Sequence, residues 1–264
     1  MPTADPLLVT AQVLQERTAH AAATDGKVNT PLALLSDETG PFLQTRIRLG
    51  HYQSRLFDWR YRVDTCGQQS VSQLGITGQR AVEVHGFSSS SIGIVRAILA
   101  RLPIQHKEWV FTDLGSGKGR TLLLASAYPF KRVVGVEHAY SLVDISRKNL
   151  RNFIGRRSCF DSTIVVGDVL DYLPPADENL LVYMFNPFSA QLIARCVDRL
   201  ANAPLAADKR RMLCFVQQRT HLAKRVDIGQ LSKAVVPVAL DPLPFDWFSY
   251  PQLEVSLFDV RATF

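Results

Sequence analysis

The sequence predicts an α/β fold: a doubly wound, mostly parallel sheet of seven strands that ends in an antiparallel hairpin and follows an N-terminal helical extension. Three observations predict it. Short apolar strands alternate with helices from residue 109 onward, a glycine-rich turn follows the first strand, and the segment between the last two strands is too short for a helical crossover. We expect residues 1–84 to form the extension and residues 85–264 the sheet domain.

The extension has helical patterns over residues 8–23 and 42–59, separated by the breaker-rich stretch TDGKVNTP. At its end, FDWRYRVDT (57–65) mixes aromatic residues with arginines. This mixture is typical of an amphipathic helix end that packs on a core, and the alternative is that it lines the entrance of a site. The sheet domain then opens with an expected helix over 92–102, which the serines at 88–91 can cap and Pro103 ends.

The centre of the domain is expected to hold five strands, at 109–114, 132–137, 163–166, 180–185 and 212–216. Helices are expected between them at 119–128, 140–153 and 190–200. A short helical piece near 221–226 precedes the last two strands, at 234–240 and 254–260. Because parallel neighbours need crossover connections, we expect five strands to follow crossover helices and the last two strands to pair antiparallel.

The composition fits one large domain, or one core with an added segment. The chain has 264 residues, of which 47% are hydrophobic and 20% charged. Thirty lysines and arginines against 24 acids give a net charge of +6, in short clusters such as Arg46 with Arg48 and Arg60 with Arg62. Scattered clusters are typical of solvated helix faces, and the alternative is a basic docking surface for an acidic partner such as nucleic acid.

The sequence also argues against several classes of protein. No run of roughly 18 apolar residues occurs, so we expect no contact with a membrane, and the N-terminus carries no readable secretory signal. No histidine pairs with a cysteine at ligand spacing, so we expect no metal site. We expect a cytoplasmic protein with four reduced, mostly buried thiols, at Cys66, Cys159, Cys196 and Cys214.

The most informative segment joins the first strand to its helix and reads Asp113-Leu114-Gly115-Ser116-Gly117-Lys118-Gly119-Arg120. Glycines there allow a tight turn and let a ligand approach the main chain closely. A P-loop would need serine or threonine at position 119, so that class fails. A dinucleotide-binding loop would need its third glycine at position 120, where arginine stands, which leaves a nicotinamide-binding protein as an alternative.

The pattern Asp-x-Gly-x-Gly-x-Gly, with an acid at the end of the second strand (GVE), resembles motif I and its partner in the class I S-adenosylmethionine-dependent methyltransferases. That family has a Rossmann-like core with seven strands and a terminal antiparallel hairpin. The resemblance covers residues 88–264, and in DLGSGKGR, GVE, GD and NPF the chain looks most like a bacterial group of the family. It resembles more loosely the protein-lysine methyltransferases that have a Rossmann core.

The resemblance implies S-adenosylmethionine as the cofactor, and the chemistry of that molecule agrees. It has a cationic methionine end, a ribose diol and an adenine but no phosphate, so acids are expected along its length. Resemblance assigns Asp113 to the methionine ammonium. Glu137 is placed to accept both ribose hydroxyls, and Asp168 to accept the adenine amino hydrogens beside the backbone N–H of Val169. The turn residues assigned to the cofactor are Gly115, Ser116, Gly117 and Gly119.

For each acid taken singly, capping of the following helix is the alternative to cofactor binding. All three acids end successive strands and face one crevice, which favours binding. Lys118 and Arg120 are unsuited to a cationic ligand, and we assign them no binding role.

The reacting end is expected at Asn186-Pro187-Phe188, directly after the fourth strand. These residues resemble the [DNS]-P-P-[YFW] signature of amino-group methyltransferases, but the second proline is missing, which puts a nucleobase or glutamine-amide acceptor in doubt. The alternative is a strand end with asparagine as a helix cap. Resemblance also places residues 85–88 over the methionine moiety and the aromatic loop 245–250 at the acceptor pocket, although such a loop is more often core cover.

The sequence therefore predicts a methyltransferase that acts on a nitrogen of a protein or small-molecule acceptor. No general base is identified. The alternatives are a non-catalytic module that binds S-adenosylmethionine or a nucleotide, and a nicotinamide-dependent oxidoreductase.

Overall fold

The computed structural model of the chain describes residues 41–185, 188–219, 226–243 and 252–262. The chain divides into two compact units, Met1–Thr45 and Arg46–Phe264, and the second holds all the sheet strands. The predicted domain boundary between residues 84 and 85 stays a prediction.

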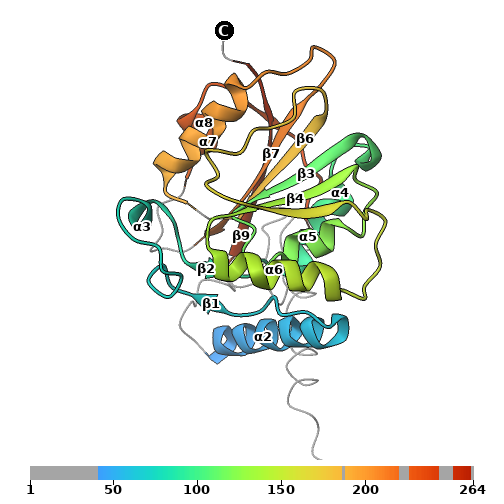
Figure 1. The fold of residues 1–264 in the computed structure, drawn as a ribbon, viewed down its shortest axis with the longest axis vertical. Helices are drawn as coiled ribbons and strands as arrows, with labels where there is room; N and C mark the ends of the chain where they lie inside the picture. Colours follow the sequence, from blue (N-terminus) through green and yellow to red (C-terminus); the bar gives the residue numbers. More distant parts are fainter. Residues whose placement is uncertain (1–40, 186–187, 220–225, 244–251, 263–264) are drawn as a thin grey trace, which may run out of the picture. The chain divides into compact units, whose positions relative to one another are not determined.

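A seven-stranded sheet runs through the second unit in the order β5-β4-β3-β6-β7-β9-β8 (Figure 1). Neighbours from β5 to β7 are parallel, and β9 is antiparallel to both β7 and β8, which confirms the predicted fold class and terminal hairpin. The strands are β3 (Trp109–Leu114), β4 (Arg132–Glu137), β5 (Ser162–Val166), β6 (Asn179–Phe185), β7 (Arg211–Arg219), β8 (Val235–Val238) and β9 (Gln252–Val260). The strands β4 and β5 are added on one side of β3, and β6 is added on its other side. Open sheets of this kind bind ligands at such a switch in strand order.

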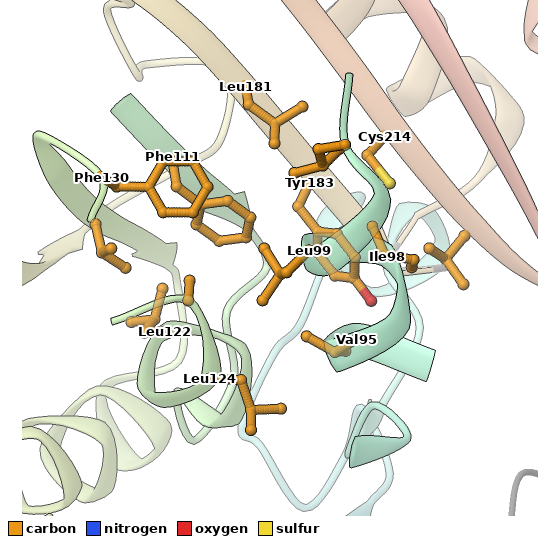
Figure 2. Close-up of a cluster of buried hydrophobic side chains, with 14 of the residues drawn as sticks. Val95, Ile98, Leu99, Phe111, Leu122, Leu124, Phe130, Leu181, Tyr183 and Cys214 are labelled. Atoms are coloured by element: carbon orange, nitrogen blue, oxygen red, sulfur yellow. The ribbon is translucent and has the colours of Figure 1, made fainter. Parts of the chain in front are cut away.

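Helices cover both faces of this sheet because its central strands are apolar on both sides. Along β3, Phe111 packs into one buried cluster and Val110 into the other, since successive side chains point to opposite faces. The first cluster joins the sheet to α4 (Ile92–Arg101) and α5 (Arg120–Ala125), and Figure 2 shows Leu99 and Leu122 reaching it from these helices. The second cluster joins the sheet to α7 (Ala190–Asn202) and α8 (Ile228–Leu231).

The remaining elements precede β3, except for one helix after β4 that contacts β4 and β5. They are α2 (Pro41–Tyr61), β1 (Gln68–Gln69), α3 (Arg80–Glu83), β2 (Phe87–Ser88), a 3₁₀ turn at His106–Glu108 and α6 (Tyr140–Asn152). Side chains of Ser91 and Ser189 cap α4 and α7 by accepting the N–H groups of Ile94 and Leu192.

Two expectations differ from the structure. The helix predicted over 119–128 ends at Ala125. The connection from β5 to β6, Gly167–Glu178, contains no helix, so the prediction that five strands follow crossover helices is wrong for β6. Pro174 and Pro175 explain the difference, because proline removes a backbone donor and disfavours helix at the residue before it. The helix predicted at 8–23 lies outside the described residues, as does the helical piece predicted near 221–226 except for Val226, which is not helical.

The glycine loop between β3 and α5 is tied to the end of α2 through its two basic residues. Arg120 is 3% exposed, and its guanidinium donates to Thr65 Oγ1 (2.8 Å), to the Ser90 carbonyl (3.0 Å) and to Ser54 Oγ (3.1 Å). Lys118 Nζ donates to Asp64 Oδ1 at 2.7 Å and to the Cys66 carbonyl at 2.8 Å. Both cations therefore bind the segment that follows α2.

Two further features bear on the classes that the sequence argues against. Within the described ranges, no helix combines the length and the apolar character needed to cross a bilayer. All four cysteines are free thiols, three of them buried and Cys66 half-buried. The cytoplasmic location stays a prediction.

Arg120 predicts a large stability effect. Replacing Arg120 with Ala leaves the buried Ser90 carbonyl and Thr65 hydroxyl without this donor, and Asp58, 4.0 Å from the guanidinium, without its cation. We expect the free energy of unfolding, measured by urea denaturation, to fall by about 3–5 kcal/mol. The exposed Arg147 on α6 is the control, and Arg147→Ala should change stability by less than about 0.5 kcal/mol. Equal effects of the two variants would contradict a tie between loop and α2.

Candidate functional site

A cavity of about 300 Å³ opens at the carboxyl ends of β3 and β4 and beside the turn that follows β5. Its walls are the glycine loop, the strand ends and the segment Gln68–Ser90. It brings together eight of the predicted site residues: Asp113, Gly115, Ser116, Gly117, Glu137, Asp168, Val169 and Phe188. The three acids that the sequence assigns to one crevice thus line one cavity.

The glycine loop forms the floor of the cavity because its backbone folds back onto β4. The N–H groups of Gly115 and Ser116 both donate to the carbonyl of Val136, at 2.9 and 3.1 Å. Gly117 has φ of 53°, and a Cβ there would lie 2.6 Å from the ring of Phe87. A side chain at this position would be strained and would have no room, so only glycine fits.

Gly119 has a structural rather than a lining position. It has φ of 80°, stands at the N-cap of α5 and does not line the cavity. A Cβ on Gly119 would lie 2.3 Å from Ser146 Oγ on α6, so this glycine allows α5 and α6 to approach closely.

Glu137, at the end of β4, holds the glycine loop in place. Its Oε2 accepts the N–H of Gly117 at 2.9 Å and its Oε1 accepts the N–H of Ala139 at 2.8 Å. Burial raises the pKa of the Glu137 carboxyl, and these backbone donors oppose the shift. Each oxygen keeps a further lone pair for a ligand hydroxyl. Ala139, not Glu137, is the N-cap of α6.

Asp113 is the most deeply buried acid of the cavity. It is 3% exposed, and burial raises its pKa to about 8, with the nearby Glu137 carboxylate adding to the rise and a hydrogen bond from the Thr121 side chain opposing it. Gly119 caps the helix that follows, so Asp113 does not act as that cap. An acid with such a pKa is stabilised in its ionised form by a nearby cation, which makes this part of the cavity suited to a cationic group.

Asp168 has partners that sequence reasoning missed. Its Oδ2 forms an ion pair with Arg80 of α3, and its Oδ1 accepts the N–H of Leu170 at 2.9 Å. Arg80 also pairs with Glu83 at 2.9 Å, and Glu83 with Arg195 of α7 at 2.8 Å. Arg80 precedes Asp168 by 88 residues and lies in a stretch without a regular pattern, so no local signal pointed to it.

The segment Gln68–Ser90 covers the cavity and contacts both of its ends. The strands β1 and β2 pair antiparallel, and Phe87 of β2 lies against Gly117. At the other end, Val84 forms a bridge to Phe188, and the N–H of Ser189 donates to the Glu83 carbonyl at 2.7 Å. Residues 85–88, expected from resemblance to lie over the site, line the cavity, as do Gln68, Leu74 and Ile76, which the sequence did not single out.

Of the three residues predicted to lie beside the transferable methyl group, Asn186, Pro187 and Phe188, the structure describes Phe188. Asn186 and Pro187 lie outside the described residues, as do residues 245–250 of the aromatic loop. Phe188 is 6% exposed and lines the cavity. The side chain of Ser189 caps α7, which removes the need for Asn186 in that role.

The entrance alternative for residues 57–65 finds no support, because none of them lines the cavity. Instead, Phe57 is buried in the first apolar cluster, and Tyr61 and Val63 pack against it. The interpretation of a helix end packing on the core is therefore the better one for these three side chains.

Among the comparisons with known proteins, the search of solved structures alone found matches. No family model matches the chain, and no curated protein matches it. Among solved structures, it is similar to an RNA methyltransferase from Salinibacter ruber in complex with S-adenosyl-L-homocysteine, with 18% identity over 66% of this chain and 95% of that chain and a TM-score of 0.43. It is also similar to the mitomycin 7-O-methyltransferase MmcR, with 15% identity over 86% and 70% of the two chains and a TM-score of 0.47.

The 23S rRNA methyltransferase ErmE is a third similar structure, with 15% identity over 66% of this chain and 69% of that chain and a TM-score of 0.44. The α/β fold of this chain is established by its own strand order and antiparallel end hairpin.

The raised pKa of Asp113 predicts a pH dependence of stability. The folded protein holds this proton up to about pH 8, whereas the ordinary value is 3.8. Above pH 3.8 the unfolded chain releases this proton while the folded protein keeps it. The free energy of unfolding is therefore highest below pH 3.8 and falls as the pH rises to about 8. Between these limits, wild type should lose up to about 1.4 kcal/mol per pH unit relative to Asp113→Asn.

Urea denaturation of both proteins from pH 5 to pH 9 measures this difference in slope, whatever the absolute stability of the variant. Asp144→Asn, at an exposed position of α6, is the control and should follow wild type. Parallel profiles for wild type and Asp113→Asn would show that Asp113 titrates as an ordinary exposed acid.

Proposed function

We propose that this protein is an S-adenosylmethionine-dependent methyltransferase that acts on a nitrogen of a protein or small-molecule acceptor. The observation that carries the proposal is the convergence of Asp113, Glu137 and Asp168 on one cavity whose floor is bare glycine-loop backbone. Three acids suit a ligand that carries a cation, a diol and an amino group, and they do not suit a phosphate.

The glycine loop adds to this fit because Gly115, Ser116 and Gly117 line the cavity together with Glu137 and bring no charged side chain to it. The Oγ of Ser116 is buried next to Gly135 of β4, and the ring of Phe87 lies against Gly117. Glu137 is therefore the polar group of this wall that a ligand can reach through its remaining lone pairs.

Each acid then has a distinct role in the proposal. Asp113 binds the methionine ammonium, and the ammonium lowers the pKa of this carboxyl toward its ordinary value. Glu137 accepts both ribose hydroxyls through its remaining lone pairs. Asp168 accepts the adenine amino hydrogens while Arg80 fixes the orientation of its carboxylate, and the N–H of Val169 reaches the ring.

S-adenosylmethionine supplies an electrophilic methyl group, so the chain must mainly position the acceptor and exclude water. Orientation of two reactants can account for about 7–11 kcal/mol of barrier reduction. In the proposal, Asn186 and Pro187 hold the acceptor N–H groups through the asparagine side chain and a main-chain carbonyl. Phe188, buried at the cavity wall, forms an apolar side beside them.

A nicotinamide-dependent oxidoreductase is the less suitable alternative. A dinucleotide pyrophosphate needs N–H donors or cations, but Lys118 and Arg120 are engaged with residues 54–66 and Ser90, and buried acids line the cavity. A non-catalytic binding module would use the same cavity. Transfer of labelled methyl groups from the cofactor into fractionated cell extract separates that alternative from an enzyme.

Glu137 gives the sharpest test of cofactor binding. Its carboxylate also accepts two buried N–H groups, so Glu137→Ala would disturb the loop and Glu137→Gln is the better variant. We expect Glu137→Gln to weaken S-adenosylmethionine binding about 10- to 100-fold in calorimetry, because hydrogen bonds to a charged group contribute about 1.5–3 kcal/mol. Asp144→Asn should bind as wild type does. Binding of NADH without binding of S-adenosylmethionine would overturn the proposal.

Asn186 separates chemistry from binding. We expect Asn186→Ala to leave S-adenosylmethionine affinity within about threefold, a change well below the roughly 1.4 kcal/mol that a tenfold difference represents. Labelled methyl transfer should fall about 100-fold or more, as expected for the loss of one well-placed polar group.

Ser189→Ala is the matched control for Asn186→Ala. Ser189 caps α7, and its loss should lower stability by about 0.5–2 kcal/mol without a specific loss of turnover. Thermal melts accompany both variants. Unchanged transfer by a folded Asn186→Ala protein would remove Asn186 from the mechanism and direct attention to residues 245–250.

A further inference from the structure

The helix α2 presents a regular row of arginines and aromatic residues to solvent. Arg48, Tyr52, Arg55 and Trp59 follow one another in steps of four, three and four residues. Three helical turns take about 11 residues, so these four side chains lie along one stripe of the helix surface. We call this stripe the α2 outer face.

The side chains of the α2 outer face are exposed. Tyr52 is 68% and Trp59 76% exposed, and Arg48 and Arg55 are exposed as well. The opposite side of the helix is buried, with Arg46 6% and Phe57 5% exposed. Other residues of the helix therefore make its contacts with the core. Packing within the described part of the chain gives no reason for large aromatic side chains at positions 52 and 59.

The charge of the α2 outer face is positive and unbalanced. Between Arg46 and Tyr61 the helix has a single acid, Asp58, and its carboxylate accepts the N–H groups of Thr65 at 2.7 Å and Cys66 at 2.8 Å. The Asp58 carboxylate is thus engaged in contacts within the fold and forms no ion pair with the arginines of the α2 outer face. Among the described residues, neither Arg48 nor Arg55 has an ion-pair partner.

We propose that the α2 outer face binds single-stranded nucleic acid. Arginines bind phosphate oxygens, and planar aromatic side chains between them stack on unpaired bases, each such stack contributing about 1–3 kcal/mol. Alternation of the two residue types along one line matches a strand that alternates charged phosphates and flat bases. The binding requires no methyl transfer, so it stands or falls independently of the proposed function.

Two other partners fit the same surface less well. An acidic peptide would pair with the arginines but has no need of two exposed rings between them. An anionic membrane surface calls for a helix whose apolar face is free, but the apolar residue Phe57 of this helix is buried in the core. Charge and aromatic residues together favour a nucleic-acid strand.

The test uses the full chain and a fluorescein-labelled 20-nucleotide oligouridylate, without cofactor, in fluorescence anisotropy at low salt. Tyr52→Ala/Trp59→Ala should weaken binding about tenfold or more, because two stacking contacts are lost. Arg48→Ala/Arg55→Ala should lower the slope of log affinity against log salt by about 1.4, the value for two phosphate contacts on a single strand.

Matched controls are Phe160→Ala, an aromatic residue that is 79% exposed elsewhere, and Arg147→Ala on α6. Both should bind as wild type does, and all four variants should melt as wild type does because the altered side chains are exposed. Three results would overturn the proposal: no oligonucleotide binding by wild type; binding that Tyr52→Ala/Trp59→Ala leaves unchanged; or equal competition by polyglutamate or anionic vesicles.

Discussion

The hydrogen bond from the Gly117 N–H to the Glu137 carboxylate is the interaction on which the rest of the site depends. It joins the glycine loop to the end of β4, and the bonds from Gly115 and Ser116 to the Val136 carbonyl reinforce it. Because the loop is held against β4 in this way, its backbone rather than its side chains faces the cavity. Phe87 can then lie against Gly117, at a place where any Cβ would collide with its ring.

The charged residues around the loop differ in their partners. Asp113 and Glu137 line the cavity, whereas Lys118 and Arg120 donate to the segment after α2, with Arg120 also bordering the cavity. Burial raises the pKa of both acids, which stores electrostatic free energy that a cationic ligand can recover. The cost of ionising these two buried acids and the preference of the site for positive charge thus have the same origin.

The helix α2 illustrates how one element serves two purposes. Phe57 fixes the helix to the core, and Ser54 accepts a hydrogen bond from the buried guanidinium of Arg120, which also donates to Thr65 just after the helix. Among the described residues, these contacts leave the α2 outer face exposed. In the same way, the segment Gln68–Ser90 links the two ends of the cavity through Phe87 and Val84.

The sequence by itself determined the strands, the antiparallel end and the three acids of the cavity. Buried parallel strands are continuous apolar runs, and residues that end such strands meet at one edge, so local patterns suffice to locate Asp113, Glu137 and Asp168. Only the tertiary structure decided that Arg80 pairs with Asp168 and that Trp59 is exposed while Phe57 is buried. Contacts across tens of residues, and the side of a helix that finds a neighbour, depend on how the elements pack, and a local pattern carries no record of that packing.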